Sequence, residues 1–243
     1  MAKDAGDIII LDNNIGSIVK AVLYGRNIFK SIRKFIVLQL MMNFCAVGVS
    51  MICPFLGIDA PVTVVQMLWI NIIMDTLGGL AFAGEAPPAS CMQEKPKRRD
   101  QAILNRYMIN EIVFHGSFTV AMYLVFLKCP FFIRQFRQAP DNIYLMTAFF
   151  ALFIFSSVFN CFNARTDRLR LLSGIEENKP FVGIMTAILL IQLVFVYVGG
   201  AVLRTAPLTL RELGVTALCA LSVFPAEFLR KLLWRARGKT ERY

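Results

Sequence analysis

Six apolar stretches, each long enough to cross a lipid bilayer, constrain this chain more than any other feature. A membrane-spanning helix needs about 20 mostly apolar residues. The stretches that meet this length are residues 35–56, 62–84, 107–127, 143–162, 180–202 and 213–229. Hydrophobic residues make up 57% of the chain and charged residues 17%, against about 25% charged residues in soluble domains. The sequence therefore predicts an all-α membrane protein, a six-helix transmembrane bundle.

The first 34 residues differ in character from the rest. Residues 1–14 hold a short apolar run between acidic and Asn residues, which is typical of a buried strand from a soluble α/β unit. In residues 15–34, apolar side chains recur at helical spacing with Lys and Arg between them. This pattern predicts an amphipathic cytoplasmic stalk helix that continues into the first span. Residues 35–232 then form the six-span domain, and residues 233–243 form a basic cytoplasmic tail.

The basic residues predict how the chain lies in the membrane. The chain has 26 Lys and Arg, 16 Asp and Glu, and a formal net charge of +10. Of the basic residues, 21 fall in the segments on one side of the six spans and five on the other. The positive-inside rule therefore places both termini in the cytoplasm. The same distribution explains the net charge, so the expected partner is the lipid bilayer, with its anionic headgroups near the tail, and not nucleic acid.

Cysteine and histidine offer no further site. The six Cys residues show no CxxC spacing, and the chain has a single His. This spacing predicts neither a disulfide framework nor a zinc site, and packing within apolar helices is the expected role of the thiols.

The polar residues of the second span are the first candidate site. Asn71 and Asp75 lie four residues apart, so one face of the helix carries both side chains. Hard cations take carboxylate, amide and backbone carbonyl oxygens, and Gly78 and Gly79 would let the helix loosen and turn carbonyls toward an ion. The alternative is a polar pair that hydrogen-bonds neighbouring helices. Asn43, in the middle of the first span, either faces the same cavity or bonds another helix.

Other polar residues lie near the predicted cytoplasmic ends of the spans. A polar stripe on the fourth span consists of Ser157, Asn160 and Asn163. We expect this stripe to hold helices together. Glu111 and His115 share a face of the third span, which favours a pair between them over a proton-linked role. Glu227 precedes Arg230 and Lys231, and we expect it to snorkel to the interface.

Five segments resemble P-type cation pumps, in the order in which such pumps carry them. They are Ala2–Asn14 (end of the phosphorylation domain), Gly25–Phe35 (stalk of the fifth helix), Gln66–Thr76 (sixth helix), Arg98–Asp100 (the loop after it), and Phe162–Arg165 with Asn160 ahead of it (eighth helix). The most similar subgroup is the plasma-membrane-type calcium pumps and their bacterial relatives. The resemblance implies the C-terminal membrane half, helices five to ten, of a calcium-transporting ATPase in the cell membrane.

The resemblance also assigns ligands. It implies that Asn71 and Asp75 bind Ca²⁺, the transported ion. Pumps that move two calcium ions carry Glu at the positions of Ala46 and Ser157, so the resemblance implies one calcium per cycle. The rest of the site would come from a Glu and carbonyls of the fourth helix.

The catalytic parts of such a pump lie outside these 243 residues. The sequence contains neither the DKTGT phosphorylation motif nor another nucleotide-binding motif. ATP and Mg²⁺ would therefore act only through the N-terminal half of the pump, its partner. The chain would then be a truncated product, a split subunit or an excerpted domain, and the start at Met1, inside a domain, favours truncation or a misplaced gene start. The alternatives are a pump for Mn²⁺ or Na⁺, an inert or regulatory product, and a stand-alone channel or carrier.

Overall fold

The computed structural model describes residues 9, 12, 14–58, 60–87, 89–93, 96, 102–166 and 178–237. Over these residues the secondary structure is helical, and six segments are long and apolar enough to cross a membrane. The segments are α1 (Ile15–Phe55), Val64–Ala83, α4 (Arg106–Lys128), Pro140–Arg165, α7 (Lys179–Val198) and Leu210–Ala236. The prediction of an all-α, six-helix membrane bundle is confirmed.

Three of the six segments are built from more than one helical element. Val64–Ala83 consists of α2 (Val64–Ile73), the π-helix η2 (Met74–Gly78) and α3 (Gly79–Ala83). Pro140–Arg165 joins the 3₁₀ turn η4 (Pro140–Asn142) to α6 (Ile143–Arg165), and Leu210–Ala236 joins α9 (Leu210–Leu221) to α10 (Val223–Ala236). The short elements between the segments are η3 (Ala89–Gln93), α5 (Pro130–Ile133) and α8 (Gly200–Leu203).

The stalk and the first span form one uninterrupted helix, as the sequence predicts. At 1.5 Å per residue, the 41 residues of α1 extend about 60 Å, twice the thickness of the hydrocarbon core of a bilayer. Asn14 caps the helix by accepting a hydrogen bond from the Gly16 amide (2.8 Å). The Ser17 hydroxyl donates to Asp12 (2.5 Å), which holds the pKa of this carboxyl below its ordinary value. The strand predicted within residues 1–14 falls almost wholly outside the described residues.

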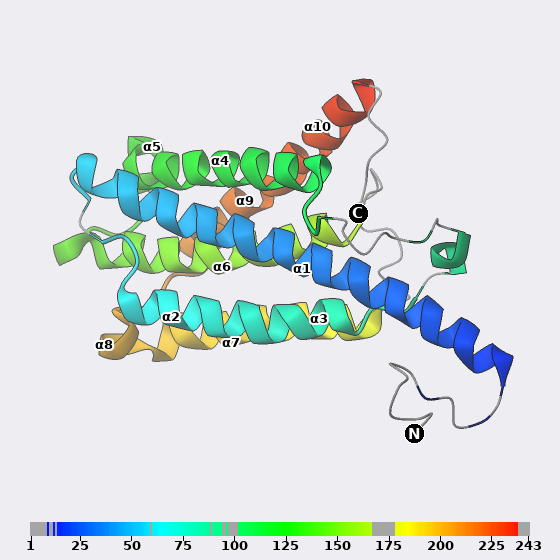
Figure 1. The fold of residues 1–243 in the computed structure, drawn as a ribbon. Coiled ribbons are helices and arrows are strands. Elements are labelled where there is room, and N and C mark those ends of the chain that lie inside the picture. The colour runs from blue at the N-terminus through cyan, green and yellow to red at the C-terminus, as the bar shows by residue number, and fades with distance from the viewer. Residues whose placement is uncertain are drawn as a thin grey trace.

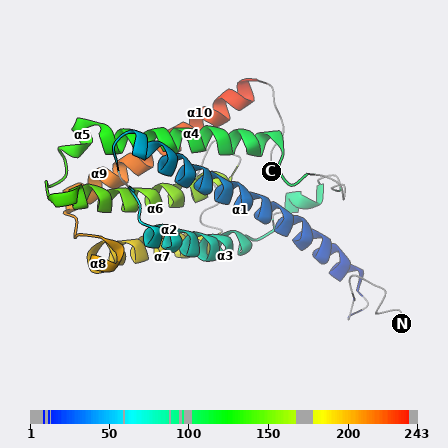
Figure 2. The same cartoon turned by 60° about the vertical axis from the view of Figure 1, so that its left-hand side comes forward.

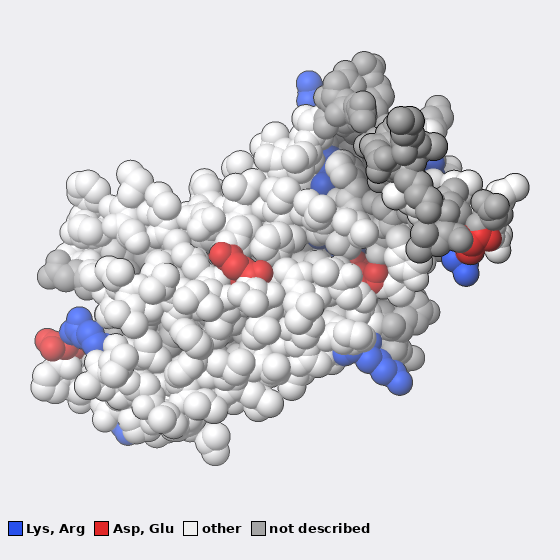
Figure 3. Space-filling model, turned by 60° about the horizontal axis from the view of Figure 1, so that its bottom comes forward, with Lys and Arg blue, Asp and Glu red and all other residues white. Residues whose placement is uncertain are grey.

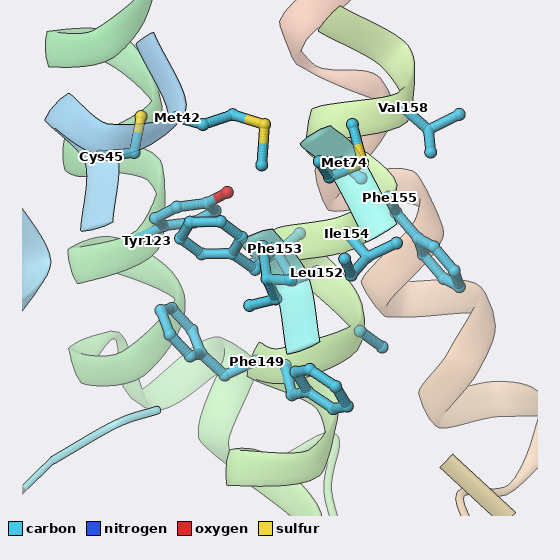
Figure 4. Close-up of a cluster of buried hydrophobic side chains, with 14 of the residues drawn as sticks. Met42, Cys45, Met74, Tyr123, Phe149, Leu152, Phe153, Ile154, Phe155 and Val158 are labelled. Atoms are coloured by element: carbon cyan, nitrogen blue, oxygen red, sulfur yellow. The ribbon is translucent and has the colours of Figure 1, made fainter. Parts of the chain in front are cut away.

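Helix α6 occupies the centre of the bundle. It runs between α4 and α9 on one side and α3 and α7 on the other (Figures 1 and 2). Nearly all its side chains are buried, including consecutive residues from Thr147 to Val158. Figure 4 shows the aromatic part of this core, where Tyr123 of α4 stacks on Phe153 with 5.3 Å between ring centroids. A helix that is apolar on all sides is expected at the centre of a bundle, because the other helices cover it completely.

The crossing of α1 and α4 depends on a glycine. A Cβ atom at Gly116 would lie only 2.4 Å from Phe44 Cδ1. The Cys45 thiol also approaches the Gly116 carbonyl oxygen, at 3.7 Å. Glycine therefore permits the close contact through which α4 supports the membrane part of α1.

We predict that Gly116→Ala destabilises the bundle by about 1–3 kcal/mol, because the added methyl group overpacks the contact with Phe44. The measurement is thermal unfolding of the purified chain in detergent. Gly183→Ala is the matched control, since a Cβ atom there meets nothing within 4 Å. Equal unfolding temperatures for the two variants would contradict the account of this crossing.

Candidate functional site

The register between α1 and the second segment brings the predicted site residues to facing positions. The Phe35 ring lies against Gly79, 3.6 Å from where a Cβ atom would stand. Because the two helices run antiparallel, four residues further along α1 correspond to four residues earlier in the second segment. Gln39 is therefore level with Asp75, and the Gln39 Nε2 atom donates a hydrogen bond to Asp75 Oδ1.

One further turn along the same register places Asn43 level with Asn71. The two helices do not stay together at this level. Helix α1 packs against α3, touches η2 and then diverges from α2 (Figure 1). Both pairs thus lie on facing positions of the two helices, but the structure joins only Gln39 and Asp75 directly.

Asp75 lies within a π-helical turn. The second segment changes from α-helix to π-helix at Met74 and returns to α-helix at Gly79, whose amide donates to the carbonyl oxygens of Asp75 and Thr76. The sequence predicts loosening at Gly78 and Gly79, and the structure places the irregular turn slightly earlier, around the carboxylate itself. Single π-helical turns occur frequently at functional sites.

The site opens to the outside of the bundle. The side chains of Asp75 and Asn43 are exposed, and those of Asn71 and Gln39 are partly buried. Exposed apolar side chains surround them, including Leu40, Phe44, Val47, Leu68 and Ile72. In Figure 3, acidic atoms stand in the middle of an otherwise uncharged face of the molecule. A carboxylate on such a surface is costly in lipid, which makes this site the candidate for a function.

The described part of the chain supplies only part of a cation shell. It contains no group of three or more His, Cys, Asp or Glu side chains that could hold a metal ion. Asp75, Asn71 and Asn43 offer one carboxylate and two amide oxygens, whereas Ca²⁺ takes six to eight oxygens.

Gln39 is the residue of this site that the sequence analysis missed. It stands four residues before Asn43 in the uncharged first span. The signal was the same i, i+4 spacing that identifies Asn71 and Asp75, applied to two amides instead of an amide and a carboxylate.

The stalk is fastened to the segment between the second and third spans. Four stalk side chains reach this segment: Arg26 to the Cys91 carbonyl oxygen (2.9 Å), Asn27 to the Glu85 carbonyl oxygen (2.7 Å), Arg33 to the Ile103 carbonyl oxygen (2.7 Å), and Lys34 to the Glu85 carboxylate (2.7 Å). Glu85 lies two residues after the second segment, so these contacts link the stalk to the helix that carries Asp75.

A second polar cluster joins α4 and α10 and corrects two predictions. Glu227 is fully buried, so the prediction that it snorkels to the interface is wrong. Its carboxylate lies 2.6 Å from His115 Nε2, 2.7 Å from Arg230 Nε and 3.0 Å from Lys231 Nζ. Glu111 contacts Arg230 at 3.3 Å. The structure thus directs the two polar residues of α4 toward α10, instead of the expected pair between them, because α10 brings two cations into the bundle.

The polar stripe of α6 adds a further contact to α10. The Asn163 side chain donates to the Val223 carbonyl oxygen of α10 and to Asn160 Oδ1, both at 3.2 Å. The Ser157 hydroxyl instead donates to the Phe153 carbonyl oxygen of its own helix (2.7 Å). The predicted interhelical role is therefore confirmed for Asn163, whereas Ser157 bonds within α6.

We predict that Glu227→Gln lowers the free energy of unfolding by about 3–5 kcal/mol, because it leaves two buried cations without their shared carboxylate. Thermal unfolding of the chain in nanodiscs measures the effect. Asp141→Asn is the control, since Asp141 is exposed in the connection between α5 and α6. An unfolding temperature unchanged in both variants would show that the cluster does not hold α10 in place.

A stalk that continues into a bundle of six membrane helices, with a polar site between two of them, defines the membrane part of an ion transporter. Residues 59–233 match the family model described as "Cation transporting ATPase, C-terminus". The chain belongs to this family.

Curated relatives agree with this family. The chain is 36% identical over 223 residues to "Plasma membrane calcium-transporting ATPase mca-1" of Caenorhabditis elegans, which covers 87% of this chain and 18% of the relative. It is 34% identical over 258 residues to "Plasma membrane calcium-transporting ATPase 4" of Bos taurus (99% and 21%) and 34% identical over 210 residues to "Calcium-transporting ATPase 10, plasma membrane-type" of Arabidopsis thaliana (86% and 20%).

These matches place the chain within a much larger kind of protein. It spans about a fifth of the length of these relatives and corresponds to the C-terminal transmembrane part of a plasma-membrane-type calcium ATPase.

Proposed function

We propose that this chain forms part of a single intramembrane Ca²⁺ site of an ATP-driven pump in the cell membrane. Asp75 and Asn71 are its ligands here, and Asn43 contributes a further amide oxygen. The observation that carries the proposal is the Asp75 carboxylate, exposed on an apolar membrane face inside a π-helical turn. The printed names of the relatives support calcium as the ion.

The remaining oxygens come from a helix that is not part of these 243 residues. Helix α1 diverges from α2 beside Asn43 and Asn71, and the polar groups there face outward. A further helix of the pump, the fourth by resemblance, covers these exposed polar groups and completes the shell with a Glu and backbone carbonyls. The same N-terminal half supplies the phosphorylated Asp and the site for ATP and Mg²⁺.

The stalk transmits the chemical step to the ion. Phosphorylation moves the cytoplasmic end of α1, and the hydrogen bonds from Arg26, Asn27 and Arg33 carry the segment after α3 with it. This movement shifts η2 against α1 and changes the shell around Asp75. Such a switch requires that the ion binds one arrangement more tightly than the other. The excess of Lys and Arg on one side supports a cytoplasmic location for the stalk and both termini.

We predict that Asp75→Asn in the assembled pump abolishes calcium-dependent phosphorylation by ATP, because the site loses its one carboxylate from this chain. Phosphoenzyme formation measured against free Ca²⁺ tests this. Asp141→Asn, which changes an exposed carboxylate in the connection between α5 and α6, should leave the calcium dependence unchanged. An unchanged calcium dependence in Asp75→Asn would overturn the proposal.

The identity of the ion needs a separate measurement. Transport of Ca²⁺, Mn²⁺ and Na⁺ by the wild type and by Asn71→Ala is compared in the same vesicles. Calcium transport in the wild type that is lost in the variant supports the proposal. Transport of Mn²⁺ or Na⁺ in preference to Ca²⁺ would make the chain part of a different cation pump.

A further inference from the structure

Asp75 has one hydrogen-bonding partner among the described residues, and that partner is Gln39. A carboxylate accepts hydrogen bonds and does not donate them, so the nitrogen of the Gln39 carboxamide must face Asp75. The bond runs from Gln39 Nε2 to Asp75 Oδ1. The second carboxylate oxygen, Oδ2, receives no hydrogen bond from the described part of the chain.

The position of Gln39 suits it to orient this carboxylate. Its side chain is partly buried between α1 and η2, and its Oε1 atom is buried and has no hydrogen-bond partner among the described residues. The carboxamide is therefore held by packing on one side and bonded to Asp75 on the other. Asp75 itself is exposed and lies in a π-helical turn, so its own helix does not fix its direction.

We propose that Gln39 is a positioning residue of the cation site. By donating to Oδ1, it fixes the rotamer of Asp75 and leaves Oδ2 directed at the transported ion. Carboxylates that bind metals are commonly held by such outer hydrogen bonds, and their loss typically weakens metal binding 10- to 100-fold. This inference rests on the proposed function, because it assigns Gln39 a role at the same site.

The role of the contact also follows from the register. Gln39 belongs to the helix that carries the stalk, whereas Asp75 belongs to the helix after it. A shift of α1 by a fraction of a turn therefore moves the donor relative to the carboxylate. The bond links the position of the stalk directly to the orientation of the ligand.

The test measures equilibrium ⁴⁵Ca²⁺ binding to the assembled pump without ATP, together with maximal phosphoenzyme at saturating Ca²⁺. Gln39→Met keeps the length of the side chain and removes the donor. We expect a half-saturating Ca²⁺ concentration 10- to 100-fold higher and maximal phosphoenzyme retained. Gln138→Met is the matched control, because Gln138 is an exposed glutamine in the connection between α5 and η4, outside the two helices that form the site. We expect this control to bind Ca²⁺ like the wild type.

Two further variants decide between roles. Gln39→Glu keeps an oxygen at this place but no amide donor, so it should not restore binding. Recovery in Gln39→Glu would show that residue 39 is an oxygen ligand and would overturn the proposal. Unchanged binding in Gln39→Met would overturn it as well. Loss of phosphoenzyme in Gln39→Met at every Ca²⁺ concentration would also overturn it, because residue 39 would then have only a structural role. Gln39→Leu repeats the measurement with a second side chain that cannot donate.

The hydrogen bond itself is tested in the 243-residue chain without calcium. Thermal unfolding of Gln39→Met, Asp75→Asn and the double variant forms a double-mutant cycle. Non-additive effects support the contact, and additive effects contradict it. Normal Ca²⁺ binding in Asp75→Asn would refute the proposed function. Loss of Ca²⁺ binding in Asp75→Asn, together with normal Ca²⁺ binding in Gln39→Met, would refute only the role of Gln39.

Discussion

Lipid offers no hydrogen-bond partners, so every polar group inside the bundle must find a partner in protein or carry a function. Glu227 meets this constraint completely, because His115, Arg230 and Lys231 surround its carboxylate in the interior. Asp75 does not, since a single amide of Gln39 reaches it and its side chain remains exposed. The contrast separates a carboxylate that holds helices together from one that is available to a ligand.

The packing around these two carboxylates differs. The helices around Glu227 are closely packed, whereas α1 and α2 separate near Asp75. Helix α6 is buried on all sides, and polar contacts join α4 and α10 to it and to each other. Along the outer face, α1 leaves α2 beside the candidate site. In the proposed function, the closely packed part supports the bundle, and further helices of a pump complete the ion shell where α1 and α2 separate.

Much of this arrangement could be predicted from the sequence. The six spans follow from the length of the apolar stretches, and the continuous stalk follows from helical spacing that runs through residue 34 without a break. Asn71 and Asp75 stood out because a carboxylate inside an apolar segment is expensive. These features depend on local spacing and on the cost of burying charge, which a sequence displays directly.

The remaining features depend on contacts between distant parts of the chain. His115, which joins Arg230 and Lys231 around Glu227, comes from α4, more than 100 residues earlier. From the sequence alone, the neighbouring Arg230 and Lys231 therefore suggested snorkelling instead of burial. The π-helical turn lies where the second segment packs against α1 and α7, contacts between distant parts of the chain. Gln39 gains significance only through the antiparallel register with Asp75. The sequence contains the residues, but their pairing is a property of the packed helices.

The most direct test of the central claim is a structure of the assembled pump determined with Ca²⁺ bound. The account predicts an ion between α1 and η2, with Asp75 Oδ2 and the Asn71 amide oxygen at about 2.3–2.6 Å and the remaining oxygens from a helix outside this chain. An ion bound elsewhere, with Asp75 paired to a protein side chain instead, would contradict it.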